Sequence, residues 1–158
     1  MRNNAPVTSR ILTAIVATFH LVIGLGIGWN VGPVEYDPAA FIVAGQPGKW
    51  QPGGLEILFP RILGCLYVSI ATGLLFAALI INTKDSIRSS LVVALCYHFG
   101  AATDAMNLFR EDTGAINADK LDPMEPIYGH SLLFTLSLIS FVLAGSVGND
   151  KSQTIKVD

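Results

Sequence analysis

Charged residues are scarce in this chain, since Asp, Glu, Lys and Arg make up 14% of it while 51% of the residues are hydrophobic. A soluble domain of this size needs more charge to cover its surface, so the composition excludes an ordinary soluble globular protein. The net charge of -2 gives no sign of nucleic-acid binding. Cysteine is also rare: Cys65 and Cys96 both lie in apolar segments, where a free thiol behaves as a small hydrophobe and indicates no particular redox compartment.

The sequence also lacks the spacings typical of cofactor and metal sites. It has no C-x-x-C-H motif and no paired ligands at helical spacing around His20 and His98, so haem and other metal centres have little support. The acidic residues Asp119, Asp122 and Glu125 do not have the spacing of an EF-hand, so calcium is unsupported as well. We therefore expect neither a cofactor nor a metal ion.

What the chain does have is a set of long apolar segments. Four of them, at residues 11–29, 62–81, 89–109 and 127–147, reach the roughly twenty helical residues that cross a bilayer core of about 30 Å. They predict an all-α fold, an integral membrane four-helix bundle that forms a single domain over residues 1–158. The first segment is longer than the apolar part of a signal peptide and has no clear cleavage site, so we expect a retained helix.

Basic residues predict the orientation of this bundle. Six of them fall in the two tails and the short second connection: Arg2, Arg10, Lys84, Arg88, Lys151 and Lys156. The other two connections hold three, or four if Arg61 at the helix edge is counted. By the positive-inside rule both termini are cytoplasmic and the two long loops are non-cytoplasmic. We expect a disordered tail at residues 148–158, and the sequence does not distinguish the endoplasmic reticulum from the plasma membrane.

The two long loops are unusual for so small a protein. The first, Gly32 to Glu56, is rich in glycine and proline and contains the apolar patch Phe41 to Val43 as well as Trp50. A connection of that length is often a lid or binding loop, which makes Trp50 a candidate substrate contact. The second, Arg110 to Pro126, holds five acidic residues, and its simplest interpretation is a solvated acidic loop.

Asp104 is the strongest candidate for a functional residue inside an apolar segment. A charged side chain in a membrane-spanning helix costs about 2.5 kcal/mol or more, so it usually faces the bundle interior and has a partner. Helical periodicity places five residues on one stripe, namely Tyr97, Gly100, Asp104, Asn107 and Glu111. This polar stripe predicts a face turned to a cavity, with Tyr97 and Asn107 as substrate contacts, or a face packed against another helix.

Arg61 and His130 are expected at the same depth as Asp104, on the non-cytoplasmic side. Arg61 follows Pro60, which suits a first helical turn, and Cys65, a candidate substrate contact, lies on the same side of that helix. His130 is expected to open the fourth helix. An ion pair between Arg61 and Asp104 with His130 beside it fits this topology. The alternatives stay open: Arg61 snorkels to lipid headgroups, Asp104 only joins helices, and His130 is an interfacial residue.

His20 and His98 lie deeper, near the middle of their helices. His98 is about 120° around its helix from Asp104, so the two do not both point straight into one small site unless the pocket is wide. For each histidine, the simplest interpretation is a neutral imidazole hydrogen-bonded between helices. Small residues, among them Gly24 and Gly64, predict close helix contacts.

The order of these residues resembles a known family. Arg-Ile-Leu-Gly from Arg61 to Gly64, Asp104 near the end of the third helix and His130 at the start of the fourth are similar to the small four-helix membrane proteins of the DoxX-like family. The similarity covers the chain from about Pro60 onward, and the first loop is longer than expected for that group. The resemblance implies the four-helix fold and a polar cluster of Arg61, Asp104 and His130, but little about activity.

Two function classes remain open. The first is an enzyme acting on a lipophilic small molecule from the bilayer, with Asp104 and His130 as acid and base and Arg61 holding an oxyanion or fixing the ionisation of Asp104. Isomerisation, proton-initiated cyclisation and epoxide opening all suit such a site. The second is a non-catalytic accessory subunit, or a lipid- or quinone-binding protein, whose charges lock the helices together. A transporter or channel has less support, because no span is discontinuous and the chain has no internal repeat.

The expected partners follow from these two classes. They are the lipid bilayer, a lipophilic small molecule, and either a second copy of this chain or another membrane protein. Nucleic acid is not expected as a partner.

Overall fold

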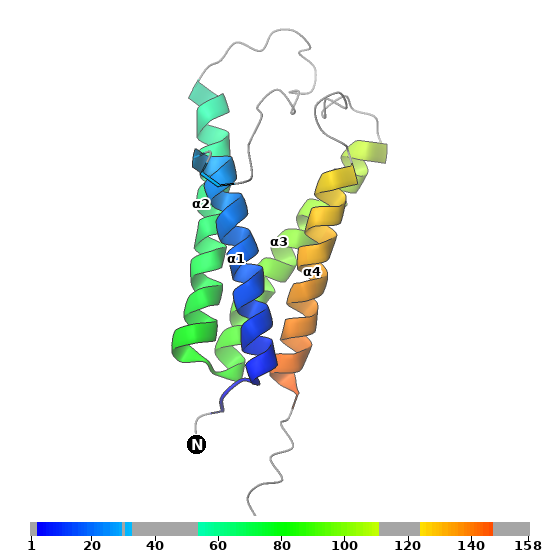
Figure 1. The fold of residues 1–158 in the computed structure, drawn as a ribbon. Helices are drawn as coiled ribbons and strands as arrows, with labels where there is room; N and C mark the ends of the chain where they lie inside the picture. The colour runs from blue at the N-terminus through cyan, green and yellow to red at the C-terminus, as the bar shows by residue number, and fades with distance from the viewer. Residues whose placement is uncertain (1–2, 30, 33–53, 111–123, 147–158) are drawn as a thin grey trace, which may run out of the picture.

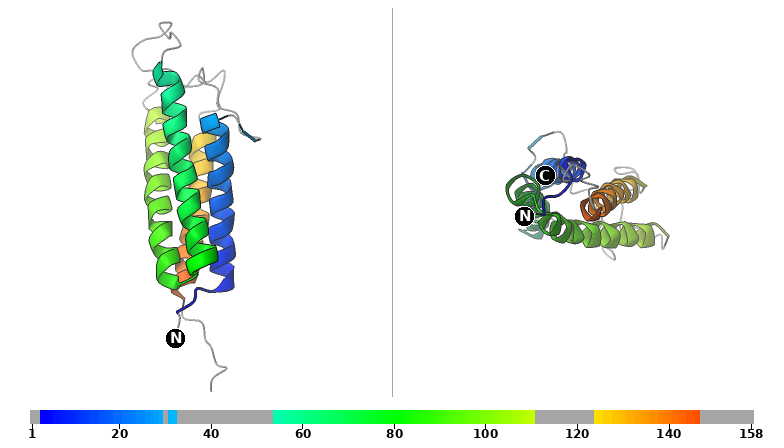
Figure 2. Two further views of the ribbon diagram at one scale, coloured as in Figure 1. Left: turned by 90° about the vertical axis from the view of Figure 1, so that its left-hand side faces the viewer. Right: turned by 90° about the horizontal axis from the view of Figure 1, so that it is seen from below.

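The computed structural model describes residues 3–29, 31–32, 54–110 and 124–146. Its elements are α1 (Val7–Trp29), α2 (Gly54–Leu75), the π-helix η2 (Phe76–Ile81) that continues α2, α3 (Lys84–Arg110) and α4 (Met124–Gly145). Figures 1 and 2 show the helices running side by side as an antiparallel bundle. The predicted all-helical fold with four helices is confirmed. The loop residue Trp50 and the tail 148–158 lie outside the described residues.

The surface of this bundle is more apolar than that of a soluble protein, and its apolar core contains several polar side chains. Its buried polar side chains are Ser9, Thr13, His20, His98, Ser137 and Ser140. On the outside, Ile80, Phe99 and Val142 are 66%, 64% and 61% exposed, and many other large apolar side chains accompany them. Soluble monomers rarely expose apolar surface of this extent. Three stretches are long and apolar enough to cross a membrane, namely Val7–Trp29, Arg61–Ile81 and Pro126–Gly145.

The third helix differs from the expectation for residues 89–109. At 27 residues α3 is long enough to span a bilayer, but it is not among the helices of the described residues that are apolar enough to do so by composition. The physical reason is that its first two turns hold Lys84, Asp85 and Arg88, and that His98, Asp104 and Asn107 interrupt the apolar residues further along.

All four helices begin before the apolar segments that predicted them. α2 begins at Gly54 and α4 at Met124, so Arg61 and His130 lie inside their helices, past the first turn, and do not open them as expected. Hydropathy marks the part of a helix in the membrane, whereas a helix end depends on local backbone bonding. Pro126 lies in the first turn of α4, where its missing N–H interrupts no intrahelical hydrogen bond.

A glycine contact joins α1 to α2. A Cβ atom on Gly64 would lie 2.6 Å from the Cα atom of Gly28 and 2.8 Å from the carbonyl oxygen of Gly24, so only a hydrogen fits there. This confirms the predicted close contact through small residues, which lets two membrane helices approach. Gly73 and Gly100, in contrast, have no such neighbour within 4 Å.

Hydrogen bonds tie the bundle together where α1 begins. The N–H of Ala5 donates to the carbonyl of Asn82 at 2.9 Å, and the N–H of Lys84 donates to the carbonyl of Asn3 at 3.0 Å. Asn82 ends η2 in the left-handed conformation, with φ of 51°. The Lys84 Nζ atom also donates to the carbonyl of Ser146, just after α4, at 3.1 Å. We call this the tied end of the bundle.

Hydroxyl groups join α1 to α4 near the tied end. Ser9 Oγ donates to the carbonyl of Ser140 at 2.9 Å, and Thr13 Oγ1 lies 2.8 Å from Ser140 Oγ. Toward the other end of the bundle, α3 and α4 lean away from α1 and α2 (Figure 1). The described helices therefore form two pairs that are closest at the tied end.

Candidate functional site

The structure places the three predicted catalytic residues in different surroundings. Arg61 on α2 and Asp104 on α3 are exposed, whereas His130 on α4 is half-buried. No ion pair joins Arg61 to Asp104 in the part of the chain that the structure describes. Of the three, only His130 has a polar partner among the described residues, and that partner is His98.

The predicted substrate contacts are also separated. Cys65 and Asn107 are exposed, and Tyr97 is half-buried against the ring of His130, with 5.8 Å between ring centroids. Tyr97 is therefore the predicted contact that the structure brings next to a predicted catalytic residue.

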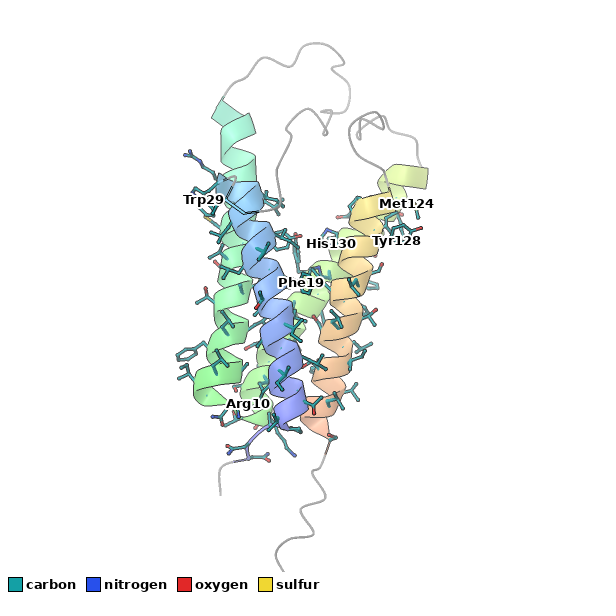
Figure 3. All side chains as sticks on the ribbon, viewed as in Figure 1. Arg10, Phe19, Trp29, Met124, Tyr128 and His130 are labelled. Carbon is teal, nitrogen blue, oxygen red and sulfur yellow. The ribbon has the colours of Figure 1, made fainter. Side chains whose placement is uncertain are left out.

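Three histidines from three helices form a hydrogen-bonded chain inside the bundle. His98 on α3 lies in the middle: its Nδ1 atom is 3.0 Å from Nδ1 of His130 on α4, and its Nε2 atom is 2.9 Å from Nε2 of His20 on α1. His20 and His98 are fully buried. The predicted hydrogen bonding of these two histidines between helices is confirmed, but their partners are each other and His130. Figure 3 shows His130 on the side of α4 that faces α1, whereas Tyr128 points away.

The backbone carbonyl of Val16 sets the direction of this chain. It lies 2.7 Å from Nδ1 of His20 and can only accept, so Nδ1 of His20 must carry the hydrogen. In a neutral His20 the Nε2 atom is then an acceptor, and Nε2 of His98 must donate to it. By the same step His98 accepts at Nδ1, and Nδ1 of His130 must donate. One carbonyl thus assigns the tautomers of three rings.

This assignment leaves Nε2 of His130 as the open acceptor of the neutral chain. His130 is the partly exposed member, so the basic nitrogen lies at the outer end of the chain and not at its buried end. A proton taken up there is passed inward if each hydrogen-bonding proton moves to the next ring. His20 is the last stop, because the Val16 carbonyl does not take up a proton.

Two tyrosines pack around the histidine chain. The ring of Tyr67 on α2 lies 5.6 Å from that of His20 and 5.3 Å from that of Tyr97. Tyr97 in turn lies 5.1 Å from the ring of His98. The five residues come from all four helices, and we call them the histidine cluster. Its walls are aromatic, and no carboxylate contacts it within the described ranges.

The geometry of the cluster is that of a relay and not of a metal cage. His98 directs its two ring nitrogens to two different histidines, so the three imidazoles do not converge on one point. In the described part of the chain, no group of three or more His, Cys, Asp or Glu side chains is arranged to hold a metal ion.

Sequence reasoning missed the cluster because it treated each histidine alone. The usable signal was that all three histidines of the chain fall in different predicted helices. Their meeting depends on how the helices rotate and slide against each other, which the packing of side chains decides.

Comparison with known protein families, with curated proteins and with solved structures gave no match for this chain.

Proposed function

We propose that this chain is a multi-pass membrane protein in which all four helices cross the bilayer and both termini are cytoplasmic. Two observations support a spanning α3: it packs among three helices of spanning character, and its most deeply placed polar residue, His98, is buried inside the bundle. The orientation is supported by Arg10, Lys84 and Arg88, which all lie near the tied end.

In this topology we infer an acid–base enzyme that acts on a lipophilic small molecule. The observation that carries the proposal is the hydrogen-bonded chain from His130 through His98 to His20, which leaves a basic nitrogen at its partly exposed end. A general base must lie within hydrogen-bond reach of the proton that it takes up, and the chain holds the ring of His130 in one orientation and one neutral tautomer for this role. The aromatic walls of the cluster suit an apolar substrate.

The reactions that fit are those in which a proton is taken up and returned without a redox step. In an isomerisation, Nε2 of His130 takes a proton from one carbon of the substrate and gives it back at another. In a cyclisation or an epoxide opening, a protonated His130 donates to the substrate first. The rest of the chain stabilises the imidazolium by sharing its charge among hydrogen-bonded rings.

Other predicted members of the site keep their proposed roles. Asp104 as the second acid–base group, and Arg61 as the group that holds an oxyanion or fixes the ionisation of Asp104, stay predictions, since both side chains are exposed and neither contacts the histidine cluster among the described residues. Membership of the DoxX-like family stays a prediction.

The substitution His130→Asn tests the enzymatic proposal. The amide nitrogen of Asn occupies the place of Nδ1, so the hydrogen bond to His98 is kept while the basic Nε2 atom is lost. We expect turnover of the lipophilic substrate to fall about 10²- to 10⁴-fold, the usual contribution of a general base. The measurement compares lipid extracts of cells that express either form, by mass spectrometry, with the thermal stability of each purified protein.

The matched control is Tyr128→Phe, which changes a side chain on the same helix that points away from the cluster (Figure 3). It should leave the extracts unchanged. If His130→Asn is as stable as wild type and its extract is the same, His130 is not a catalytic base and the enzymatic proposal fails. Asp104→Asn, read in the same way, tests the second acid–base group.

A second candidate is a non-catalytic bundle in which the histidine chain only joins helices. It is favoured by the way the chain links α1, α3 and α4, since hydrogen bonds between membrane helices contribute about 0.6 to 2 kcal/mol each. On this hypothesis His98→Leu lowers thermal stability, and no substitution in the cluster changes the lipid extract.

A further inference from the structure

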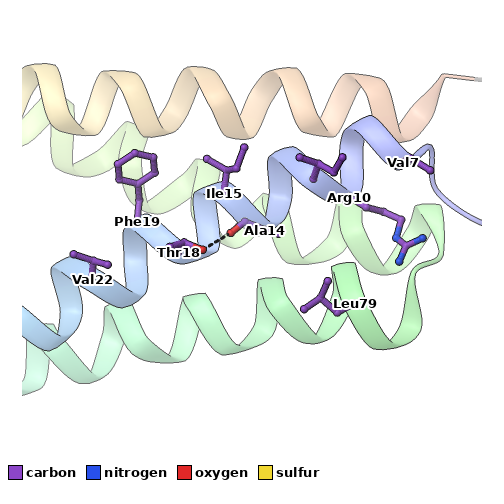
Figure 4. A pocket seen from close by; sticks show the side chains of 9 residues that line it. Val7, Arg10, Ala14, Ile15, Thr18, Phe19, Val22 and Leu79 are labelled. Carbon is purple, nitrogen blue, oxygen red and sulfur yellow. Dashed lines mark hydrogen bonds between the residues drawn. The ribbon is translucent and has the colours of Figure 1, made fainter.

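A groove of about 550 Å³ runs along the outer face of α1, away from the histidine cluster. Figure 4 shows it between the side chains of α1 and Leu79 of η2. Its lining includes Val7, Arg10, Ala14, Thr18, Val22 and Leu79, together with exposed apolar side chains of α1. Because α1 is long and apolar enough to cross a membrane, this groove opens toward lipid.

The length and the lining of the groove suit one acyl chain. From Val7 to Val22 a helix rises about 22 Å. One leaflet of the hydrocarbon core is ~15 Å thick, so the groove is long enough to hold an acyl chain that extends through that leaflet. The single hydroxyl in the lining, on Thr18, already donates to the carbonyl of Ala14 at 2.9 Å. Beyond Arg10, the lining therefore offers no unsatisfied donor to a polar ligand and is suited to hydrocarbon.

Arg10 puts one positive charge at the tied end of the groove. Its Nε atom donates to the carbonyl of Ala78 at 2.9 Å, which fixes the half-buried guanidinium in place. That bond leaves the two terminal nitrogens as donors, and in the part of the chain that the structure describes no carboxylate pairs with them. A guanidinium binds phosphate through two parallel hydrogen bonds, so this end of the groove suits a phosphate group.

An apolar groove with one fixed cation at its end matches an amphiphile with one anionic end. We propose that the α1 groove binds an anionic phospholipid, with an acyl chain along Ala14 and Thr18 and the phosphate at Arg10. The occupant belongs to the leaflet on the side of the tied end. Basic residues beside membrane helices select anionic lipids in this way. The proposal is independent of any chemistry at the histidine cluster.

The test uses the full chain in nanodiscs made of equal parts phosphatidylglycerol and phosphatidylcholine with identical acyl chains. Mass spectrometry of the released protein measures the ratio of the two lipids that stay bound. We expect wild type to favour phosphatidylglycerol about fivefold, the effect of one basic residue on one anionic headgroup. Arg10→Gln should abolish this preference, and Arg10→Lys, which keeps the charge, should retain most of it.

Matched variants distinguish lipid binding in this groove from a general effect of positive charge and from an effect of misfolding. Arg88→Gln removes another cation near the tied end, one whose guanidinium lies 4.4 Å from the ring centroid of Phe141 and outside the groove, and should leave the ratio unchanged. Ala14→Phe fills the groove and should lower retention of both lipids, whereas Val92→Phe on the outside of α3 should not.

Equal retention of both lipids by wild type overturns the proposal. So does a ratio in Arg10→Gln that equals the wild-type ratio, or a loss in Arg88→Gln as large as that in Arg10→Gln. Unchanged retention in Ala14→Phe shows that the headgroup binds without the groove, which also overturns it.

Discussion

At the scale of single residues, the carbonyl of Val16 decides where the protons of the histidine cluster lie. Because it accepts from Nδ1 of His20, each ring further along the chain has one possible tautomer in the neutral state. The same geometry limits the charge. Two imidazolium rings whose facing nitrogens lie 2.9 to 3.0 Å apart in a desolvated core repel strongly, so two neighbouring rings of the cluster are not charged at the same time.

Nitrogen-15 spectra of histidine-labelled protein check this assignment directly. The chain has three histidines, so every ring signal belongs to the cluster. We expect the hydrogen on Nδ1 of His20, on Nε2 of His98 and on Nδ1 of His130 in the neutral protein. Single histidine substitutions assign the signals to residues. A hydrogen on Nε2 of His20 is incompatible with the bond to Val16 and contradicts the assignment.

Single residues also show which features of the site could be predicted from the sequence. The angle between His98 and Asp104 on one helix was predictable, and the structure indeed buries the first and exposes the second. The contact of His98 with His20 and His130 was not, because it depends on rotations between helices. Charge drew attention to Arg61 and Asp104, whereas the buried network is built from side chains that are neutral and easily overlooked.

At the scale of elements, the apolar segments located the helices but not their ends. The π-helical turn of η2 is an example. The N–H of Asn82 donates to the carbonyl of Ala77, five residues earlier, and no residue type in Phe76–Ile81 announces that bond. Asn82 then tolerates the left-handed conformation that starts the turn into α3. The glycine contact between α1 and α2, in contrast, was visible as small residues in the sequence.

Gly64→Ala tests that contact. The added methyl group meets backbone atoms of Gly28 and Gly24 that do not move aside easily, so α1 and α2 must separate. Overpacking of this kind costs about 1 to 3 kcal/mol, and we expect a lower midpoint of thermal unfolding in detergent. Gly73→Ala on the same helix is the control, because its methyl group meets nothing within 4 Å and alanine favours helix. Equal midpoints for the two variants would show that the contact is not tight.

At the scale of the whole molecule, large apolar side chains cover much of the outer surface, and a few polar groups are buried among an otherwise apolar core. This distribution suits lipid as the solvent, since the apolar outer surface needs no hydrogen-bond partner and the buried groups of Thr13, Ser140 and the three histidines find partners in each other. The antiparallel order brings the start of α1, the connection from η2 to α3 and the end of α4 to one side (Figure 1). The number of helices, four, was predicted from the four apolar segments.

Cysteine labelling tests the orientation. In a background with Cys65→Ala and Cys96→Ala, single cysteines replace the exposed residues Asn3, Ser146 and Val31. We expect a membrane-impermeant maleimide to reach positions 3 and 146 from the cytoplasmic face and position 31 from the opposite face. Labelling of 3 and 146 from opposite faces contradicts four spans, and the reverse pattern for all three positions contradicts the orientation.

The tied end joins the two helix pairs on one side of the bundle. Lys84 and the segment before α1 hold the helix pairs together on one side, while the pairs lean apart toward the other. Since each helix is a stiff rod, a slight pivot at the joined side becomes a displacement that grows along its length. In the imidazole chain, the contact between His20 and His98 joins α1 of one pair to α3 of the other, whereas the contact between His98 and His130 lies within the pair of α3 and α4. A displacement of one pair against the other therefore changes the nitrogen-to-nitrogen distance between His20 and His98 first.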